Sequence, residues 1–177
     1  NYFIYVGMIT YERNVLKIAE ILNDLDIPFY IAGNCTDEKL QNKIIALKNV
    51  NYLGFLNRDE IKKYVSESKC GICLFDFSLN HIVSSPNKLF EYFNYGLPVI
   101  ASNIPSWIEI NGVDKFTYFV NPSNSSEIIS SIKKISLMDD NEINIIGEKA
   151  NQFINEKFNW NIEEEKLINA YQKLISE

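Results

Sequence analysis

The chain has 177 residues, 46% of them hydrophobic, and a formal net charge of −6. This length supports one domain with a full core, and the apolar share is too high for a disordered chain. Lys and Arg are scattered among Asp and Glu without a basic stripe, which argues against a nucleic-acid partner but not against an anionic small ligand. The longest apolar runs fall far short of the roughly 20 residues that a membrane-spanning helix needs.

The chain opens on an apolar run with neither an initiator Met nor a basic leader, so we expect a piece of a longer protein without a signal peptide. Taken in chain order, short apolar runs then alternate with amphipathic segments. The predicted strands are residues 2–7, 29–32, 50–55, 71–77, 98–101 and 117–120. The predicted helices cover residues 15–22, 40–47, 57–65, 86–95, 125–136, 141–156 and 162–175.

This alternation predicts an α/β domain with a doubly wound parallel sheet of about six strands and helices on both faces. A sheet of this kind binds ligands beyond the carboxyl ends of its strands. We therefore looked for chemistry in the segments that follow the predicted strands.

The odd number of cysteines, three, argues against a disulfide framework and for a reducing compartment. Cys70 and Cys73 have the C-x-x-C spacing of a redox dithiol, and with Cys35 and His81 they would complete a zinc set of three Cys and one His. The pair, however, enters an apolar strand, on which residues three apart point to opposite faces. We therefore expect buried thiols rather than a redox or metal site.

The most informative segment lies just before and within the fourth predicted helix. Ser84 and Ser85 precede the helix, where free N–H groups and the helix dipole favour an anion. Lys88 lies in the first turn. The helix dipole disfavours a cation there unless a phosphate lies between the ammonium and the backbone N–H groups. Glu91 shares its face and could accept hydrogen bonds from both hydroxyls of a ribose. From spacing alone, an ordinary surface ion pair between Lys88 and Glu91 is the simpler interpretation.

The sequence SPNKLFEY at 85–92, followed by GLPVIAS at 96–102, resembles the donor-site signature of glycosyltransferases with the GT-B fold. It is most similar to the retaining group, glycosyl transferases group 1, that builds bacterial surface polysaccharides. The similarity extends over nearly the whole chain. Supporting segments are the first strand and its phosphate loop with Gly7 and Arg13, the strand and loop at 51–56, and FNW at 158–160.

By this resemblance, residues 1–177 form the Rossmann-like, nucleotide-sugar-binding C-terminal domain, and the N-terminal acceptor domain is absent from the chain. The resemblance implies transfer of a sugar from a nucleoside-diphosphate sugar to a polysaccharide or lipid-linked acceptor, without a metal ion or cofactor. We expect the fragment to be inactive alone. It also implies a cytoplasmic location, with any attachment to the inner membrane made through the absent half.

The resemblance assigns roles to individual residues. The diphosphate would be bound by Arg13, Ser84, Ser85 and Lys88, and the ribose by Glu91. The nucleobase would meet the loop that contains Phe55 and Leu56. Gly7, in the phosphate loop, is a further candidate. Apart from the resemblance, His81, the only histidine, lies in the loop before the signature, where it could contact sugar or phosphate or be an exposed loop residue. Preorganised cations of this kind would stabilise the charge that develops on the leaving nucleoside diphosphate.

Two positions depart from the family pattern. Many members carry an acidic residue eight positions before the ribose-binding Glu, where this chain has Val83, and an Arg after the first-strand glycine, where it has Met8. These differences leave open the sugar, the stereochemical outcome and whether the site is intact. Two alternatives also stay open, a non-catalytic α/β binding module and a nucleotide-sugar epimerase of the same fold.

Overall fold

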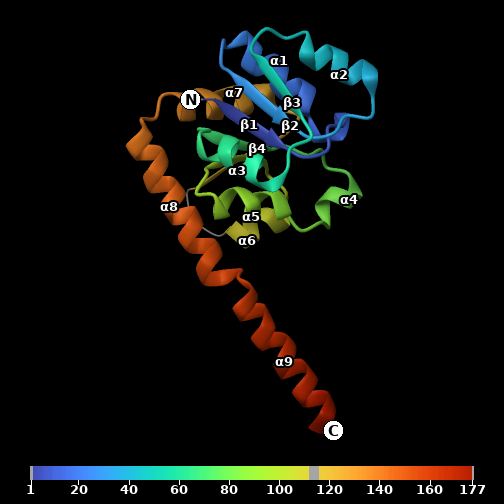
Figure 1. Ribbon diagram of the computed structural model, residues 1–177, viewed down its shortest axis with the longest axis vertical. Helices are drawn as coiled ribbons and strands as arrows, with labels where there is room; N and C mark the ends of the chain where they lie inside the picture. The colour runs from blue at the N-terminus through green and yellow to red at the C-terminus, as the bar shows by residue number, and fades with distance from the viewer. Residues whose placement is uncertain (1, 112–115, 177) are drawn as a thin grey trace.

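The computed structural model describes residues 2–111 and 116–176 and contains a six-stranded sheet whose neighbouring strands all run parallel. The strand order is β3-β2-β1-β4-β5-β6 (Figure 1). The strands are β1 (Phe3–Val6), β2 (Phe29–Ala32), β3 (Val50–Gly54), β4 (Cys70–Cys73), β5 (Val99–Ser102) and β6 (Thr117–Val120). The predicted fold class and number of strands are therefore confirmed.

Helices cover both faces of the sheet (Figure 1). Side chains along a strand alternate between faces, so Phe3 and Tyr5 enter one hydrophobic core and Ile4 enters another. The first core is closed by α1 (Val15–Asp24), α2 (Glu38–Ile45) and α7 (Ser125–Ser136). The second is closed by α3 (Arg58–Ser66), α5 (Asn87–Asn94), α6 (Pro105–Asn111) and α8 (Asp140–Lys157). Full burial of each large apolar side chain contributes about 1.5–3 kcal/mol.

Strand β4 ends at Cys73, so the prediction that it runs to residue 77 was wrong. The Ser102 hydroxyl donates to the Phe75 carbonyl at 2.6 Å and accepts from the Phe75 N–H at 2.8 Å. The Asp76 N–H donates to the Glu12 carbonyl at 2.9 Å. Because these bonds replace the strand ladder, the chain leaves the sheet. It then forms α4 (Leu79–Ile82), a one-turn helix inside the predicted polar loop, too short to show helical periodicity.

Two of the three cysteines, Cys70 and Cys73, are buried as predicted, whereas Cys35 is only partly buried. Cys70 is buried in the core on one face of the sheet and Cys73 in the core on the other. Among the residues that the structure describes, no group of three or more His, Cys, Asp or Glu side chains could hold a metal ion.

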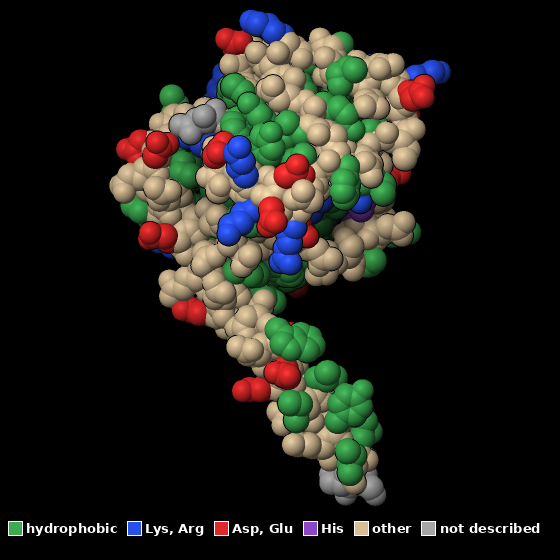
Figure 2. All heavy atoms as spheres, viewed as in Figure 1, with side chains coloured by type: hydrophobic (Ala, Val, Ile, Leu, Met, Phe, Trp, Pro, Cys, Tyr) green, Lys and Arg blue, Asp and Glu red, His purple; other side chains and the backbone are tan. Residues whose placement is uncertain are grey.

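Helix α9 (Trp160–Ser176) extends away from the rest of the domain (Figure 1). Figure 2 shows green side chains along it, and its exposed large apolar residues are Trp160, Leu167, Ile168, Tyr171, Leu174 and Ile175. Just before α9, Phe158 stacks on Phe90 with ring centroids 4.9 Å apart and thereby ties the end of α8 to α5. Across the described ranges, no helix is both long enough and apolar enough to span a membrane.

Candidate functional site

The candidate site lies at the carboxyl edge of the sheet, where the strand order reverses between β1 and β4. At such a reversal the connecting segments diverge and leave a crevice, the usual ligand site of an open α/β sheet. The segment after β1 carries a short 3₁₀ helix, η1 (Tyr11–Arg13), and the segment after β4 carries α4 and the start of α5. A cavity of about 320 Å³ lies between them. Six of the residues predicted from the sequence line it together: Arg13, His81, Ser84, Ser85, Lys88 and Glu91.

Lys88 reaches from the first turn of α5 to the end of β1, where its ammonium donates a hydrogen bond to the Val6 carbonyl. The ammonium also lies 5.6 Å from the centroid of the Tyr5 ring. Burial lowers the pKa of Lys88, an effect that Cys73 and Glu91 oppose. Val6 is its only hydrogen-bond partner among the described residues, so donors of the ammonium remain for a ligand.

The first turn of α5 contributes backbone donors beside this ammonium. Its N-cap is Pro86, which makes no side-chain capping bond. Within the described part of the chain, the N–H groups of Ser85 and Lys88 have no acceptor, whereas the Ser84 N–H donates to the His81 carbonyl at 3.3 Å. Free N–H groups at the positive end of a helix dipole favour an anion.

Arg13 supplies a second cation to the cavity. One guanidinium nitrogen donates to the Met8 carbonyl at 3.3 Å, and its central carbon lies 5.2 Å from the centroid of the Phe75 ring. Neither Arg13 nor Lys88 forms an ion pair with a carboxylate of the described residues. Lys88 and Glu91 therefore line one cavity but do not make the surface ion pair that their spacing allows.

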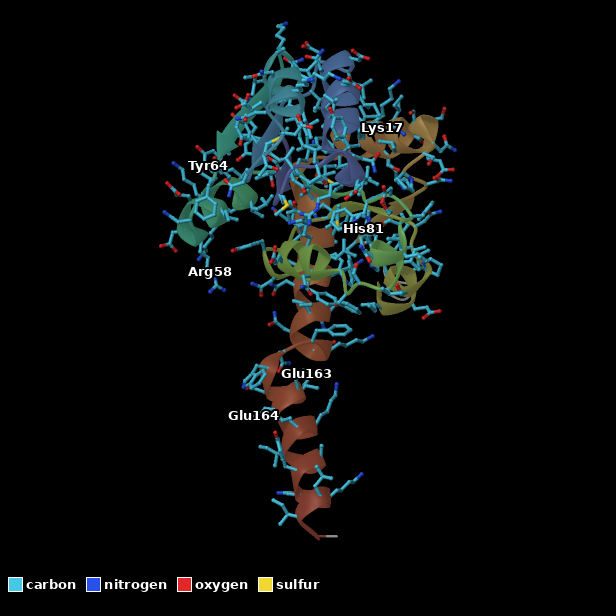
Figure 3. All side chains as sticks on the ribbon, turned by 90° about the vertical axis from the view of Figure 1, so that its right-hand side faces the viewer. Lys17, Arg58, Tyr64, His81, Glu163 and Glu164 are labelled. Atoms are coloured by element: carbon cyan, nitrogen blue, oxygen red, sulfur yellow. The ribbon has the colours of Figure 1, made fainter. Side chains whose placement is uncertain are left out.

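The loop between β4 and α5 is braced by its own side chains. The imidazole Nδ1 of His81 lies 2.8 Å from Asp76 Oδ1, and Ser84 donates its hydroxyl to the His81 carbonyl at 3.0 Å. The indole N–H of Trp107, in α6, donates to the Ser84 carbonyl at 3.0 Å. Figure 3 shows His81 in the main body of the domain, away from Glu163 and Glu164 on α9. These contacts connect Asp76, α4, Ser84 and α6 along the rim of the cavity.

Phe55 and Leu56 lie outside this cavity, in a neighbouring one of about 230 Å³ that Gly7 and Met8 also line. The Phe55 side chain is 74% exposed there. Gly7 lines the smaller cavity and lies directly against Lys88, which lines the larger one. The predicted residues thus divide into a charged group and a largely apolar group on either side of Gly7.

Two supporting residues were missed by sequence reasoning. The Tyr92 hydroxyl accepts from the Val6 N–H at 3.0 Å and contacts the Ile72 carbonyl at 3.4 Å, so it ties α5 to β1 and β4. Ser102 bonds both backbone groups of Phe75. Both residues have a signal in the sequence, because a buried hydroxyl needs a hydrogen-bond partner. Tyr92 lies on the apolar face of a helix, and Ser102 ends an apolar strand.

Comparison with known proteins gives one family match, the family described as Glycosyl transferases group 1, over residues 1–137. No curated protein sequence matches the chain.

Solved structures share the fold. A Rickettsia africae glycosyltransferase has a TM-score of 0.80 at 18% identity over 98% of this chain and 48% of its own. Sucrose-phosphate synthase from Thermosynechococcus elongatus has a TM-score of 0.78 at 16% identity, over 99% of this chain and 45% of the synthase. Anabaena HepE, in complex with UDP and glucose, has a TM-score of 0.78 at 14% identity, over 98% of this chain and 48% of HepE. The chain therefore spans about half the length of these proteins.

Proposed function

Because the chain belongs to the glycosyl transferases group 1 family, we propose that it is the C-terminal, donor-binding domain of a GT-B glycosyltransferase and binds a nucleoside-diphosphate sugar. Lys88 and Arg13 bind the diphosphate together with the backbone N–H groups of Ser85 and Lys88. Glu91 binds the ribose. The nucleobase occupies the smaller cavity, beside Phe55 and Leu56.

The single observation that carries this proposal is the partly buried ammonium of Lys88, which has no carboxylate partner among the described residues and lies beside free N–H groups at the start of a helix. Removing a cation from water without an anionic partner is costly, and the positive end of a helix dipole adds to the cost. A phosphate between the ammonium and the N–H groups would remove both penalties. The same groups would then stabilise the charge that develops on the leaving diphosphate as the sugar bond breaks.

The proposed site uses side-chain cations where other enzymes use a metal ion to neutralise phosphate. Arg13 and Lys88 line one cavity from opposite sides of the strand-order reversal, and Met8 contributes no charge. Arg13, in the segment after β1, is then the main cation from that loop and compensates for the arginine that many family members carry at the position of Met8. The UDP complex of HepE, a protein of the same fold, supports a nucleotide ligand.

We propose further that the complete enzyme is a retaining transferase that acts in the cytoplasm on a polysaccharide or lipid-linked acceptor. An N-terminal domain beyond this chain binds the acceptor, so the chain alone binds donor without transferring sugar. Val83, at the position of the missing acid, is 81% exposed at the end of α4. The transferred sugar is therefore held by groups other than a carboxylate at residue 83.

The test is calorimetric titration of the chain with UDP, GDP and ADP in parallel. We expect one of the three to bind, and Lys88→Met to weaken its binding by about tenfold or more, because a hydrogen bond to a charged group contributes about 1.5–3 kcal/mol. Lys39→Met, on the exposed face of α2, is the matched control and should bind normally. Equal affinity in the wild type and in Lys88→Met would overturn the proposal.

A further inference from the structure

A second polar pair, Asp76 and His81, lies beside the two cations of the cavity. Nδ1 of His81 lies 2.8 Å from Asp76 Oδ1 and 3.1 Å from the Asp76 carbonyl oxygen. Because a carboxylate and a carbonyl only accept hydrogen bonds, Nδ1 carries a hydrogen, which fixes the tautomer of the neutral ring. All hydrogen bonds that the His81 ring makes within the described residues use Nδ1, so Nε2 is left for a ligand.

The position of the imidazole is fixed by packing as well as by Asp76. Its ring lies 4.7 Å from the Phe75 ring, and its side chain is only 14% exposed. Phe75 is itself held by the edge of Trp107, at 5.5 Å, and by the two backbone hydrogen bonds to Ser102. Arg13 lies over the same Phe75 ring. Imidazole and guanidinium therefore flank one aromatic ring and line the same cavity.

The charged groups around this imidazole come from three segments. Asp76 follows β4, Arg13 ends η1, and Lys88 and Glu91 lie on α5. Asp76 accepts the hydrogen on Nδ1, and Arg13 and Lys88 carry the other positive charges at this cavity. A diphosphate bound between these groups is an anion to which a protonated His81 ring could donate a hydrogen bond.

We propose that Asp76 positions His81 so that the Nε2–H of the protonated ring donates a hydrogen bond to the terminal phosphate of the nucleoside diphosphate. This inference rests on the proposed function and deepens it. His81 becomes the third cationic ligand of the leaving group and makes donor binding stronger at lower pH. Asp76 is a positioning residue that acts through His81 and does not touch the ligand.

The decisive experiment uses the fact that His81 is the only histidine. Labelling histidine with ¹⁵N gives one imidazole signal set, whose Nδ1 and Nε2 shifts report tautomer and protonation without further assignment. The free protein should show the Nδ1–H tautomer at high pH. Adding whichever of UDP, GDP and ADP binds should raise the midpoint of imidazole protonation by about one pH unit, which corresponds to about tenfold tighter binding to the protonated form. The matching nucleoside monophosphate, which lacks the terminal phosphate, should move it much less.

Binding measurements on variants complete the test. His81→Gln should lower diphosphate affinity about tenfold at low pH, where the ring is protonated, and much less at high pH. Asp76→Asn should weaken diphosphate binding and reduce the response of the His81 signals to the ligand. Asp24→Asn, which changes an exposed carboxylate at the end of α1, is the matched control and should change neither.

The outcomes separate this inference from the proposed function. If a diphosphate binds and Lys88→Met weakens it, but the His81 signals and their midpoint do not respond, His81 is not a ligand and this inference alone fails. If no diphosphate binds to the wild type, both fail. A normal response of His81 in Asp76→Asn would overturn the positioning role.

Discussion

Lys88 occupies the space that a side chain at Gly7 would need. A Cβ atom built on Gly7 would lie 2.1 Å from the Lys88 ammonium nitrogen and 2.6 Å from its Cε. Gly7 also has a φ of +142°, which L side chains rarely adopt. The missing side chain after β1 is therefore what allows α5, from the connection between β4 and β5, to place a cation against the sheet edge.

This relationship predicts that Gly7→Ala weakens diphosphate binding by about tenfold or more, because the new methyl group displaces the ammonium from the Val6 carbonyl. The backbone strain should also lower the free energy of unfolding by about 1–3 kcal/mol. Calorimetry measures the first effect and urea unfolding the second.

Gly54→Ala separates the two causes. Gly54 also has a positive φ, +67°, but a Cβ there has no neighbour within 4 Å among the described residues. This variant should therefore lose stability through strain and keep its affinity. Wild-type affinity in Gly7→Ala would show that the ammonium does not need its present position.

Tyr92→Phe should lower the free energy of unfolding by about 1–3 kcal/mol, because it leaves the Val6 N–H without its partner. Urea unfolding measures the loss. Tyr95→Phe, at the C-cap of the same helix, removes a hydroxyl that bonds to no described residue and should cost much less. Equal losses in the two variants would mean that the hydroxyl of Tyr92 is not a structural tie between α5 and β1.

The buried thiol of Cys70 predicts a loss of stability in alkali. Burial raises the pKa of this thiol far above its ordinary value of 9.0. Above pH 9 the unfolded chain therefore loses a proton that the folded chain keeps, so the free energy of unfolding falls as the pH rises. Between pH 8 and pH 10, the free energy of unfolding should fall by about 1.4 kcal/mol less in Cys70→Ala than in the wild type.

Urea unfolding at the two pH values checks this difference. Ile72→Val, in the same strand, is the control, because it weakens the core without removing a titratable group. It should lose stability at both pH values but retain the wild-type dependence on pH. The same dependence in Cys70→Ala would contradict the assignment.

Deleting residues 160–176 should change the free energy of unfolding by less than about 1 kcal/mol, because the side chains of α9 are nearly all exposed. Phe158→Ala should cost about 1–3 kcal/mol, because it removes the stacking on Phe90 and the contact with Phe153. Urea unfolding of both proteins gives the comparison. A larger loss from the deletion would mean that α9 packs on the domain in solution.

Much of the fold could be predicted from local pattern. Apolar runs separated by helical periodicity gave six parallel strands, and the spacing of Lys88 and Glu91 correctly put both on one face of α5. What could not be predicted depends on contacts between distant segments. The end of β4 is set by Ser102, and the direction of the Lys88 side chain by Val6 and Gly7, none of which has a local signal near those positions.

The Asp76 and His81 pair illustrates the same limit. Residue 76 lies inside the strand that the sequence predicts at 71–77, and His81 lies beyond the end of that strand, as a candidate for contact with phosphate or sugar. Only the short turn of α4, which has no periodicity to detect, brings the carboxylate and the imidazole together. The sequence pattern could not predict this pairing, because it extended the strand past residue 76, whereas β4 ends at Cys73.

A ¹H–¹⁵N NMR titration with the binding nucleoside diphosphate shows whether a diphosphate binds between Lys88 and the start of α5. The amide signals of Ser85 and Lys88, which have no acceptor among the described residues, should shift downfield and saturate together. No such shifts should occur at Asn144 and Gln152, which line a separate polar groove between α5 and α8. Saturable shifts in that groove, with Ser85 and Lys88 unmoved, would contradict this binding mode.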